Sequence, residues 1–155
     1  MVGNAGGPAP PGNDCCCDPS CEAGVGVFAG AAVYYQDEET VGPTDARHIN
    51  NQSRFVGFWT GSPSVDPTCG DNNVKMTGLF GAALFTTDGG APTPGSPCYL
   101  AEGSADGGFG LGKLTATPPA TVGSVIAEVG IVKDPTFYPD LVVVLIQPKE
   151  PKVIS

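Results

Sequence analysis

The chain has 155 residues, a formal net charge of −9, and 23 glycines with 16 prolines. Its length suits one domain with a proper hydrophobic core, because a chain of this size buries most of the surface that it exposes when unfolded. The acidic balance and the lack of a basic patch exclude a nucleic-acid partner, since phosphate neutralisation requires clustered Lys and Arg. No apolar stretch approaches the roughly 20 residues of a membrane span, and no signal-peptide pattern is present, so we expect no membrane partner.

Residues 1–23 are predicted to form an arm outside the core. They are rich in glycine and proline and show no apolar periodicity, so they bury too little surface to offset the entropy of the chain. We therefore expect a disordered or extended N-terminal arm at 1–23, a domain at 24–148 and a tail at 149–155. An arm of this kind is suited to adding a strand to a neighbouring sheet.

The first half of the domain contains short apolar runs that are typical of strands. Loops rich in Gly, Pro, Ser, Asp and Asn separate these runs. One polar segment, 43–51, is expected to make a short helical turn with Thr44 or Asp45 as its cap. The predicted strands of this half cover residues 24–28, 31–35, 54–60, 74–80 and 81–85.

The second half continues the alternation of strands and turns. Short strands are predicted at 98–100 and 114–117, and a hairpin follows in which 125–132 pairs with 141–147 across a proline-containing turn. The last strand is apolar on both faces, which is typical of a strand covered on both sides. The domain is therefore predicted to be all-β, as a small β-barrel or a sandwich.

Three runs in the first half match three runs in the second half in type and order. In each half a tyrosine-bearing strand precedes a Val-Gly-hydrophobic strand, and a β-branched strand follows. The central members are Val56-Gly57-Phe58 and Val129-Gly130-Ile131. Although the loop lengths differ, the sequence predicts a loosely repeated module.

Catalytic chemistry has little support in this sequence. His48 is the one histidine, so a histidine-based nucleophilic mechanism would depend on it, yet its polar segment favours a loop or cap role. No G-x-S-x-G elbow presents a serine. The glycine-rich runs at 24–30 and 107–112 lack the helix pattern or the lysine of a nucleotide-binding loop. We expect neither an enzyme nor a cofactor.

The cysteines are the most unusual feature of the chain. Four of them fall within seven residues and two follow far along the sequence: Cys15, Cys16, Cys17, Cys21, Cys69 and Cys98. Disulfides, free thiols and thiolate ligands for a soft metal are the three states that such a set can adopt. Adjacent cysteines make poor simultaneous ligands, and no histidine pair completes a zinc knuckle, which argues against metal. The connectivity of any disulfides is left open.

Two groups of short motifs resemble those of small phage structural proteins. The first group consists of Val33-Tyr34-Tyr35, the His-containing segment 45–51 and Arg54-Phe55-Val56-Gly57-Phe58. The second consists of Gly95-Ser96-Pro97-Cys98-Tyr99-Leu100, Gly112-Lys113-Leu114-Thr115 and Val129-Gly130-Ile131. In this order, over residues 25–148, they are similar to motifs of capsid decoration (cement) proteins and head fibres of tailed bacteriophages.

The resemblance implies a β-tulip-like or related small barrel on the outer capsid surface of a virion. It also implies the major capsid protein as partner and a homo-oligomer, with a trimer favoured. A cement protein binds the expanded shell and not its precursor, and thereby stabilises the expanded form. A trimer that touches several capsid subunits gains further through effective concentration.

Two other functions remain open at this point. One is a receptor-binding domain of a tail fibre, which would present exposed aromatic side chains from the set Phe58, Trp59, Phe109, Phe137 and Tyr138. The other is a secreted, disulfide-stapled carbohydrate-binding module with Trp59 as its sugar platform.

Overall fold

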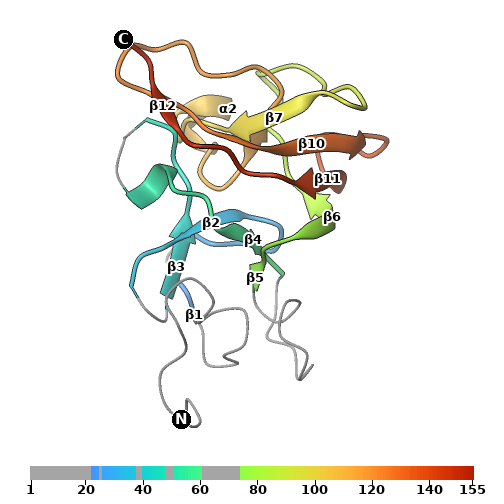
Figure 1. The fold of residues 1–155 in the computed structure, drawn as a ribbon, viewed down its shortest axis with the longest axis horizontal. Helices are drawn as coiled ribbons and strands as arrows, with labels where there is room; N and C mark the ends of the chain where they lie inside the picture. The colour runs from blue at the N-terminus through green and yellow to red at the C-terminus, as the bar shows by residue number, and fades with distance from the viewer. Residues whose placement is uncertain (1–21, 25, 38–39, 48–50, 61–73) are drawn as a thin grey trace, which may run out of the picture.

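The computed structural model describes residues 22–24, 26–37, 40–47, 51–60 and 74–155. Within these ranges the regular secondary structure is almost entirely β, which confirms the predicted class. Two five-stranded sheets occupy the lower and upper parts of the molecule in Figure 1, and a two-stranded sheet accompanies the upper one. Over the described ranges the strands do not close into a barrel. Of the two predicted architectures, the layered one is therefore found.

The first sheet has the order β1-β3-β2-β4-β5. All its strand pairs are antiparallel except β1 with β3. The helical turn predicted at 43–51 lies partly outside the described residues, and a 3-10 turn, η1 (Asn51–Ser53), ends this segment. The strands are β1 (Glu22–Ala23), β2 (Ala32–Tyr35), β3 (Thr40–Pro43), β4 (Gly57–Trp59) and β5 (Val74–Lys75).

The second sheet has the order β6-β11-β10-β7-β8 and is antiparallel throughout. The pairing of β10 with β11 confirms the predicted hairpin. A four-residue segment, α2 (Ala105–Gly108), lies between β7 and β8. The strands are β6 (Gly78–Ala83), β7 (Pro97–Leu100), β8 (Leu114–Thr115), β10 (Glu128–Asp134) and β11 (Val142–Ile146).

The two sheets share one strand order. The first contains β3-β2-β4-β5 and the second contains β8-β7-β10-β11, each joined by antiparallel pairs only. The central glycines of the two halves have the same surroundings. A Cβ atom on Gly57 would lie closer than 3.0 Å to the carbonyl oxygen of Lys75 on β5, and one on Gly130 would lie equally close to that of Leu145 on β11. The topology therefore supports the predicted repeat.

The larger cluster of buried side chains lies between the two sheets. It takes Ala32 and Phe58 from the first sheet and Leu100, Val129 and Val144 from the second, among others. Because successive residues of a strand point to opposite faces, the neighbours of Ala32 and Phe58 form a second cluster on the other face of the first sheet. The first sheet is thus apolar on both faces.

Aromatic side chains of the first sheet are buried in these clusters. Phe58 stacks on Phe80 with ring centroids 4.6 Å apart and meets Phe55 edge-on at 5.1 Å, arrangements that add to the burial term. Trp59 points to the second cluster and is 8 % exposed. A sugar platform requires an exposed ring, so the structure does not offer Trp59 in that role.

The predicted hairpin is longer than the sequence indicated. Strand β12 (Lys152–Val153) pairs antiparallel with β9 (Val125–Ile126). Between the two pairings, the Lys149 amide donates to the Glu128 carbonyl at 2.9 Å, and Lys149 Nζ lies 3.3 Å from Glu128 Oε2. The segment 149–155 that we delimited as a tail therefore continues the pairing past two prolines. The fold also extends N-terminally beyond the predicted limit, through β1.

The buried carboxylate of Asp45, paired with the partly exposed Arg47, ties the first sheet to the loop after β7 of the second. The Asp45 side chain, which follows β3, is 3 % exposed and accepts hydrogen bonds from Arg47 Nη2 at 2.8 Å and from the backbone amides of Arg47 and Gly103 at 2.9 and 3.0 Å. Gly103 lies in the loop after β7. Burial raises the pKa of Asp45, but the hydrogen bonds from Arg47 outweigh it and hold that pKa below its usual value. The carboxylate is therefore charged where the two sheets meet.

Candidate functional site

The turn between β10 and β11, residues 134–141, presents apolar side chains to solvent; we call it the exposed turn. Phe137 is 66 % exposed and Leu141 is 51 % exposed. Leu141 also has a φ of 53°, in the left-handed region that costs a bulky residue about 1–3 kcal/mol. Such residues persist only where their surroundings hold them, and they cluster in binding sites. The exposed turn is therefore the candidate site.

Local hydrogen bonds fix the backbone of the exposed turn. The Asp134 carboxylate accepts from the amide of Thr136 at 3.0 Å and from its hydroxyl. The hydrogen bond from the Thr136 hydroxyl lowers the pKa of Asp134. The Tyr138 amide donates to the Pro135 carbonyl at 2.9 Å, and the peptide bond between Tyr138 and Pro139 is cis.

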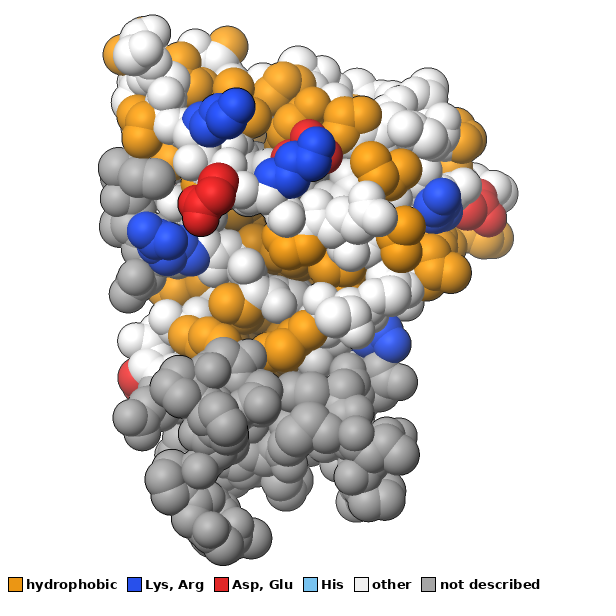
Figure 2. Space-filling model, in the orientation of Figure 1, with side chains coloured by type: hydrophobic (Ala, Val, Ile, Leu, Met, Phe, Trp, Pro, Cys, Tyr) orange, Lys and Arg blue, Asp and Glu red, His pale blue; other side chains and the backbone are white. Residues whose placement is uncertain are grey.

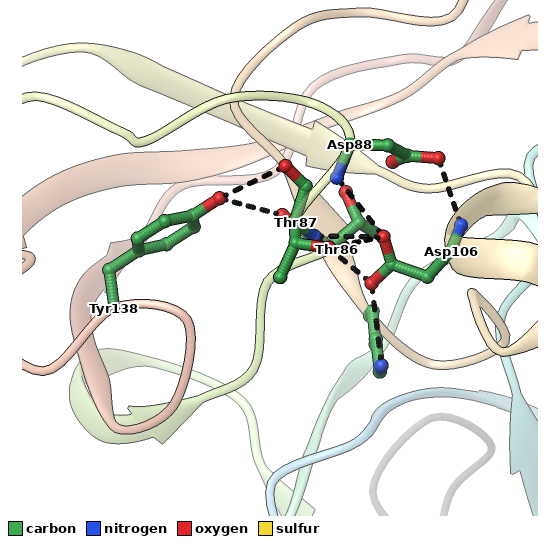
Figure 3. A network of polar contacts seen from close by, with 6 residues as sticks. Thr86, Thr87, Asp88, Asp106 and Tyr138 are labelled. Carbon is green, nitrogen blue, oxygen red and sulfur yellow. Dashed lines mark hydrogen bonds and ion pairs between the residues drawn. The ribbon is translucent and has the colours of Figure 1, made fainter.

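Two further contacts anchor the exposed turn to the segment after β6. The Phe85 amide donates to the Pro139 carbonyl at 2.8 Å. The Tyr138 hydroxyl points at the carbonyl oxygens of Thr86 and Thr87, each 3.3 Å away (Figure 3). Since a hydroxyl has one proton, the two carbonyls share it. These contacts fix the exposed turn to the segment after β6, while the Phe137 side chain remains exposed to solvent.

Asp106 holds the segment that receives Tyr138. Its carboxylate accepts from the amide and hydroxyl of Thr87 and from the amide of Asp88, at 2.9–3.0 Å, and its own amide donates to Asp88 Oδ2 at 2.9 Å (Figure 3). Lys113 Nζ lies 3.6 Å from Asp106 Oδ2. Asp106 has a φ of 51° within α2, so this segment is a tight turn and not a regular helix.

The charges of this network act on its titrating groups. Burial raises the pKa of Asp106, but the hydrogen bonds from Thr87 and Asp88 outweigh it and lower that pKa overall. Burial, together with the negative charges of Asp106 and Asp88, raises the pKa of Tyr138. At neutral pH the carboxylate is therefore an acceptor and the phenol a donor, as the contacts in Figure 3 require.

Replacing Tyr138 with phenylalanine should loosen the exposed turn without unfolding the domain. The change removes one shared hydrogen bond, which is worth about 1 kcal/mol of unfolding free energy. We expect faster amide hydrogen exchange across 135–141, measured by mass spectrometry. Tyr99→Phe is the matched control, because Tyr99 is half-buried on β7 and its hydroxyl makes no hydrogen bond to the described residues. Equal exchange in both variants would contradict the anchoring role.

Acid should release the exposed turn through Asp106. Since the pKa of Asp106 is lower in the folded state, its stabilising contribution is complete above the usual value of 3.8 and is lost as the pH falls through the folded-state value. The protection of the Thr87 and Asp88 amides, which is the observed exchange rate corrected for the intrinsic rate at each pH, should therefore fall on acidification below about pH 4. In Asp106→Asn the pH dependence of this protection should disappear. Unchanged pH dependence in that variant would assign the effect to another carboxylate.

The sequence-predicted site residues are dispersed or lie outside the described ranges. Cys98 is a buried free thiol on β7 whose Sγ lies 3.5 Å from the Gly130 carbonyl oxygen. Burial, followed by the negative charge of Glu128, raises its pKa to about 12, so this thiol is a core group and not a reactive one. His48 and the other five cysteines, at positions 15, 16, 17, 21 and 69, fall outside the described residues.

The aromatic candidates divide into three groups. Phe109 and Phe137 are exposed, Phe58 and Trp59 are buried, and Tyr138 anchors the exposed turn. In the ranges that the structure describes, no group of His, Cys, Asp and Glu side chains could hold a metal ion, and no helix is long and apolar enough to cross a membrane. Sequence reasoning missed Asp106 and Leu141, whose roles depend on backbone angles and on partners distant in the sequence.

Comparison of the chain with protein-family models, with curated proteins and with solved structures finds no match.

Proposed function

We propose that this chain is a structural virion protein that binds the outer surface of a phage capsid and stabilises the expanded shell. The observation that carries the proposal is the exposed turn, in which Phe137 and Leu141 are displayed on a backbone fixed by hydrogen bonds. A side chain on a fixed backbone loses little entropy on binding, so an exposed aromatic residue there suits a protein–protein anchor. The motif resemblance supports the major capsid protein as the partner.

The charge of the exposed turn defines the chemistry of the partner surface. Residues 134–141 include Asp134 and Asp140 and no basic residue. The complementary capsid surface would offer an apolar pocket for Phe137 with Lys or Arg at its rim. Exposed charges of this kind steer association and are screened by salt, so the association rate should fall as ionic strength rises.

Stabilisation of the shell follows from mass action. A ligand that binds only one state stabilises it by RT ln(1 + [L]/Kd), about 2.7 kcal/mol when the free ligand is at 100 times Kd. The protein therefore needs no chemistry on the shell, only a preference for the expanded form. The burial of Trp59 weighs against the carbohydrate-binding alternative, which relied on that ring.

The test is cosedimentation of the purified chain with expanded heads and with precursor shells of the same phage. We expect binding to expanded heads only, and a loss of affinity of at least tenfold in Phe137→Ser. Val122→Ser is the matched control, because Val122 is 74 % exposed and adjoins β9, far along the hairpin from the exposed turn. Equal binding to both shells, binding to tails alone, or full binding by Phe137→Ser would contradict the proposal.

A further inference from the structure

A row of apolar side chains crosses the outward side of the second sheet; we call it the outer row. Strand pairing places Leu79 of β6 opposite Leu145 of β11, Leu145 opposite Ile131 of β10, and Ile131 opposite Pro97 of β7. Leu79 is 58 % exposed, and the other three are half-buried. None of the four belongs to either core cluster or packs against one. The row therefore points away from the core.

The outer row does not suit contact with water. An antiparallel sheet with one wet face normally carries polar residues at its outward positions. Here four neighbouring strands each contribute an apolar residue, and Val143 lies beside them on β11, half-buried. This explains why β11 is apolar at every position although its alternate residues are only half-buried. A continuous apolar strip of this kind marks a contact surface.

The charges around the outer row favour a second copy of the chain as its occupant. The row itself has no ionisable side chain, and both ends of β10 carry both signs: Glu128 with Lys149 at one end, Lys133 with Asp134 at the other. A surface that meets its own copy across a two-fold axis must be self-complementary. Charges of both signs around the row can pair across such an axis, whereas charges of one sign would repel each other.

The face seen in Figure 2 is consistent with this choice of occupant. On the face seen in Figure 2, basic and acidic side chains are scattered among apolar ones and form no single-sign patch. With a net charge of −9, two copies repel each other in general, so an uncharged strip is where they can approach. A strongly basic or acidic partner would find no complementary field at the outer row.

We propose that two copies of the chain pack their second sheets face to face through the outer row, related by a two-fold axis. Two sheets stacked in this way lie about 10 Å apart. The row spans four strands spaced about 4.8 Å apart, so it is roughly 15–20 Å wide. A strip this narrow makes a small contact, and small interfaces are weak, so we expect a dissociation constant on the order of micromolar or weaker. The contact yields a dimer, whereas the motif resemblance implies a trimer.

The test is sedimentation equilibrium of the full chain with a reductant present, from about 0.1 μM to 1 mM, a range that brackets micromolar association. We expect a monomer–dimer equilibrium for the wild type. Leu79→Lys and Ile131→Lys should each weaken dimerisation at least tenfold, since each buries a charge in the contact. Val122→Lys places the same charge on an exposed apolar site away from the row and should leave the dimer intact.

Circular dichroism and thermal melts show whether each variant folds. If Ile131→Lys is unfolded, Leu79→Lys and Leu79→Glu decide the matter, because Leu79 is exposed on an edge strand. A wild type that stays monomeric at every concentration would overturn the proposal, and so would a wild-type trimer. Leu79 variants that dimerise with the same dissociation constant as the wild type would also overturn it. The result is independent of capsid binding, because no shell is present in the experiment.

Discussion

Gly130→Ala should lower the free energy of unfolding by about 3 kcal/mol, an effect at the upper end of overpacking substitutions. A Cβ atom there would lie closer than 3.0 Å to the Leu145 carbonyl oxygen and 2.9 Å from Val144 Cγ1. The carbonyl belongs to the backbone of the paired strand β11, so it cannot move away without disturbing the hairpin. The measurement is urea unfolding followed by circular dichroism.

Gly57→Ala should produce a loss of similar size in the first sheet. Its Cβ would meet the backbone of β5 in the same way. Gly81→Ala is the matched control, because its Cβ would meet only Val143 Cγ2 at an ordinary 3.9 Å, and its effect should stay within about 0.5 kcal/mol. If Gly57→Ala is as mild as Gly81→Ala, the two Val-Gly-hydrophobic motifs do not share a structural role.

Asp45→Ala should cost about 2–4 kcal/mol of unfolding free energy at neutral pH. The change removes the acceptor of the buried Gly103 amide and the carboxylate that Arg47 contacts, and an unsatisfied buried donor is costly. Because Arg47 is partly exposed, water compensates part of the loss, which keeps the expected value below that of a fully buried pair. Chemical denaturation measures it.

The pH dependence of the unfolding free energy shows whether Asp45 stabilises the fold through its charge or through its shape. Its pKa is lower in the folded state, so its contribution is complete above the usual value of 3.8 and disappears as the pH falls through the folded-state value. Asp45→Asn should therefore be destabilised at pH 7 and should approach the wild type in acid. Asp140→Asn, which changes an exposed carboxylate in the exposed turn, is the control and should change the unfolding free energy at pH 7 by no more than about 0.5 kcal/mol. A constant difference between Asp45→Asn and wild type would reject the charge argument.

Local patterns in the sequence predicted much of this fold. The hairpin of β10 and β11 was found because β-branched runs on either side of a proline-containing turn specify strands through short-range preferences. The repeat was found because Gly57 and Gly130 each follow a valine and precede a hydrophobic residue, and both meet a neighbouring strand. Close approach of two backbones requires glycine, so a glycine within a strand pattern indicates this role in the sequence.

Features that depend on distant partners were not predicted. The prolines at 148 and 151 indicated an end to the last strand, yet pairing resumes at β12, because an edge position tolerates missing amide donors. Nothing near Asp106 identifies Thr87 and Asp88 as its partners, 19 and 18 residues away. Phe137 was one of five aromatic residues that the sequence offered as exposed candidates, but which of the five is exposed depends on packing. The choice between a barrel and layers likewise depends on how the two halves meet.

We propose that the exposed turn is the contact surface for the capsid. Hydrogen exchange of the chain, free and bound to expanded heads, tests it most directly, because a buried turn loses access to solvent. We expect strong added protection at 135–141 and none at the loop of Val122. Protection confined to other segments, with 135–141 unchanged on the bound protein, would contradict this account of the site.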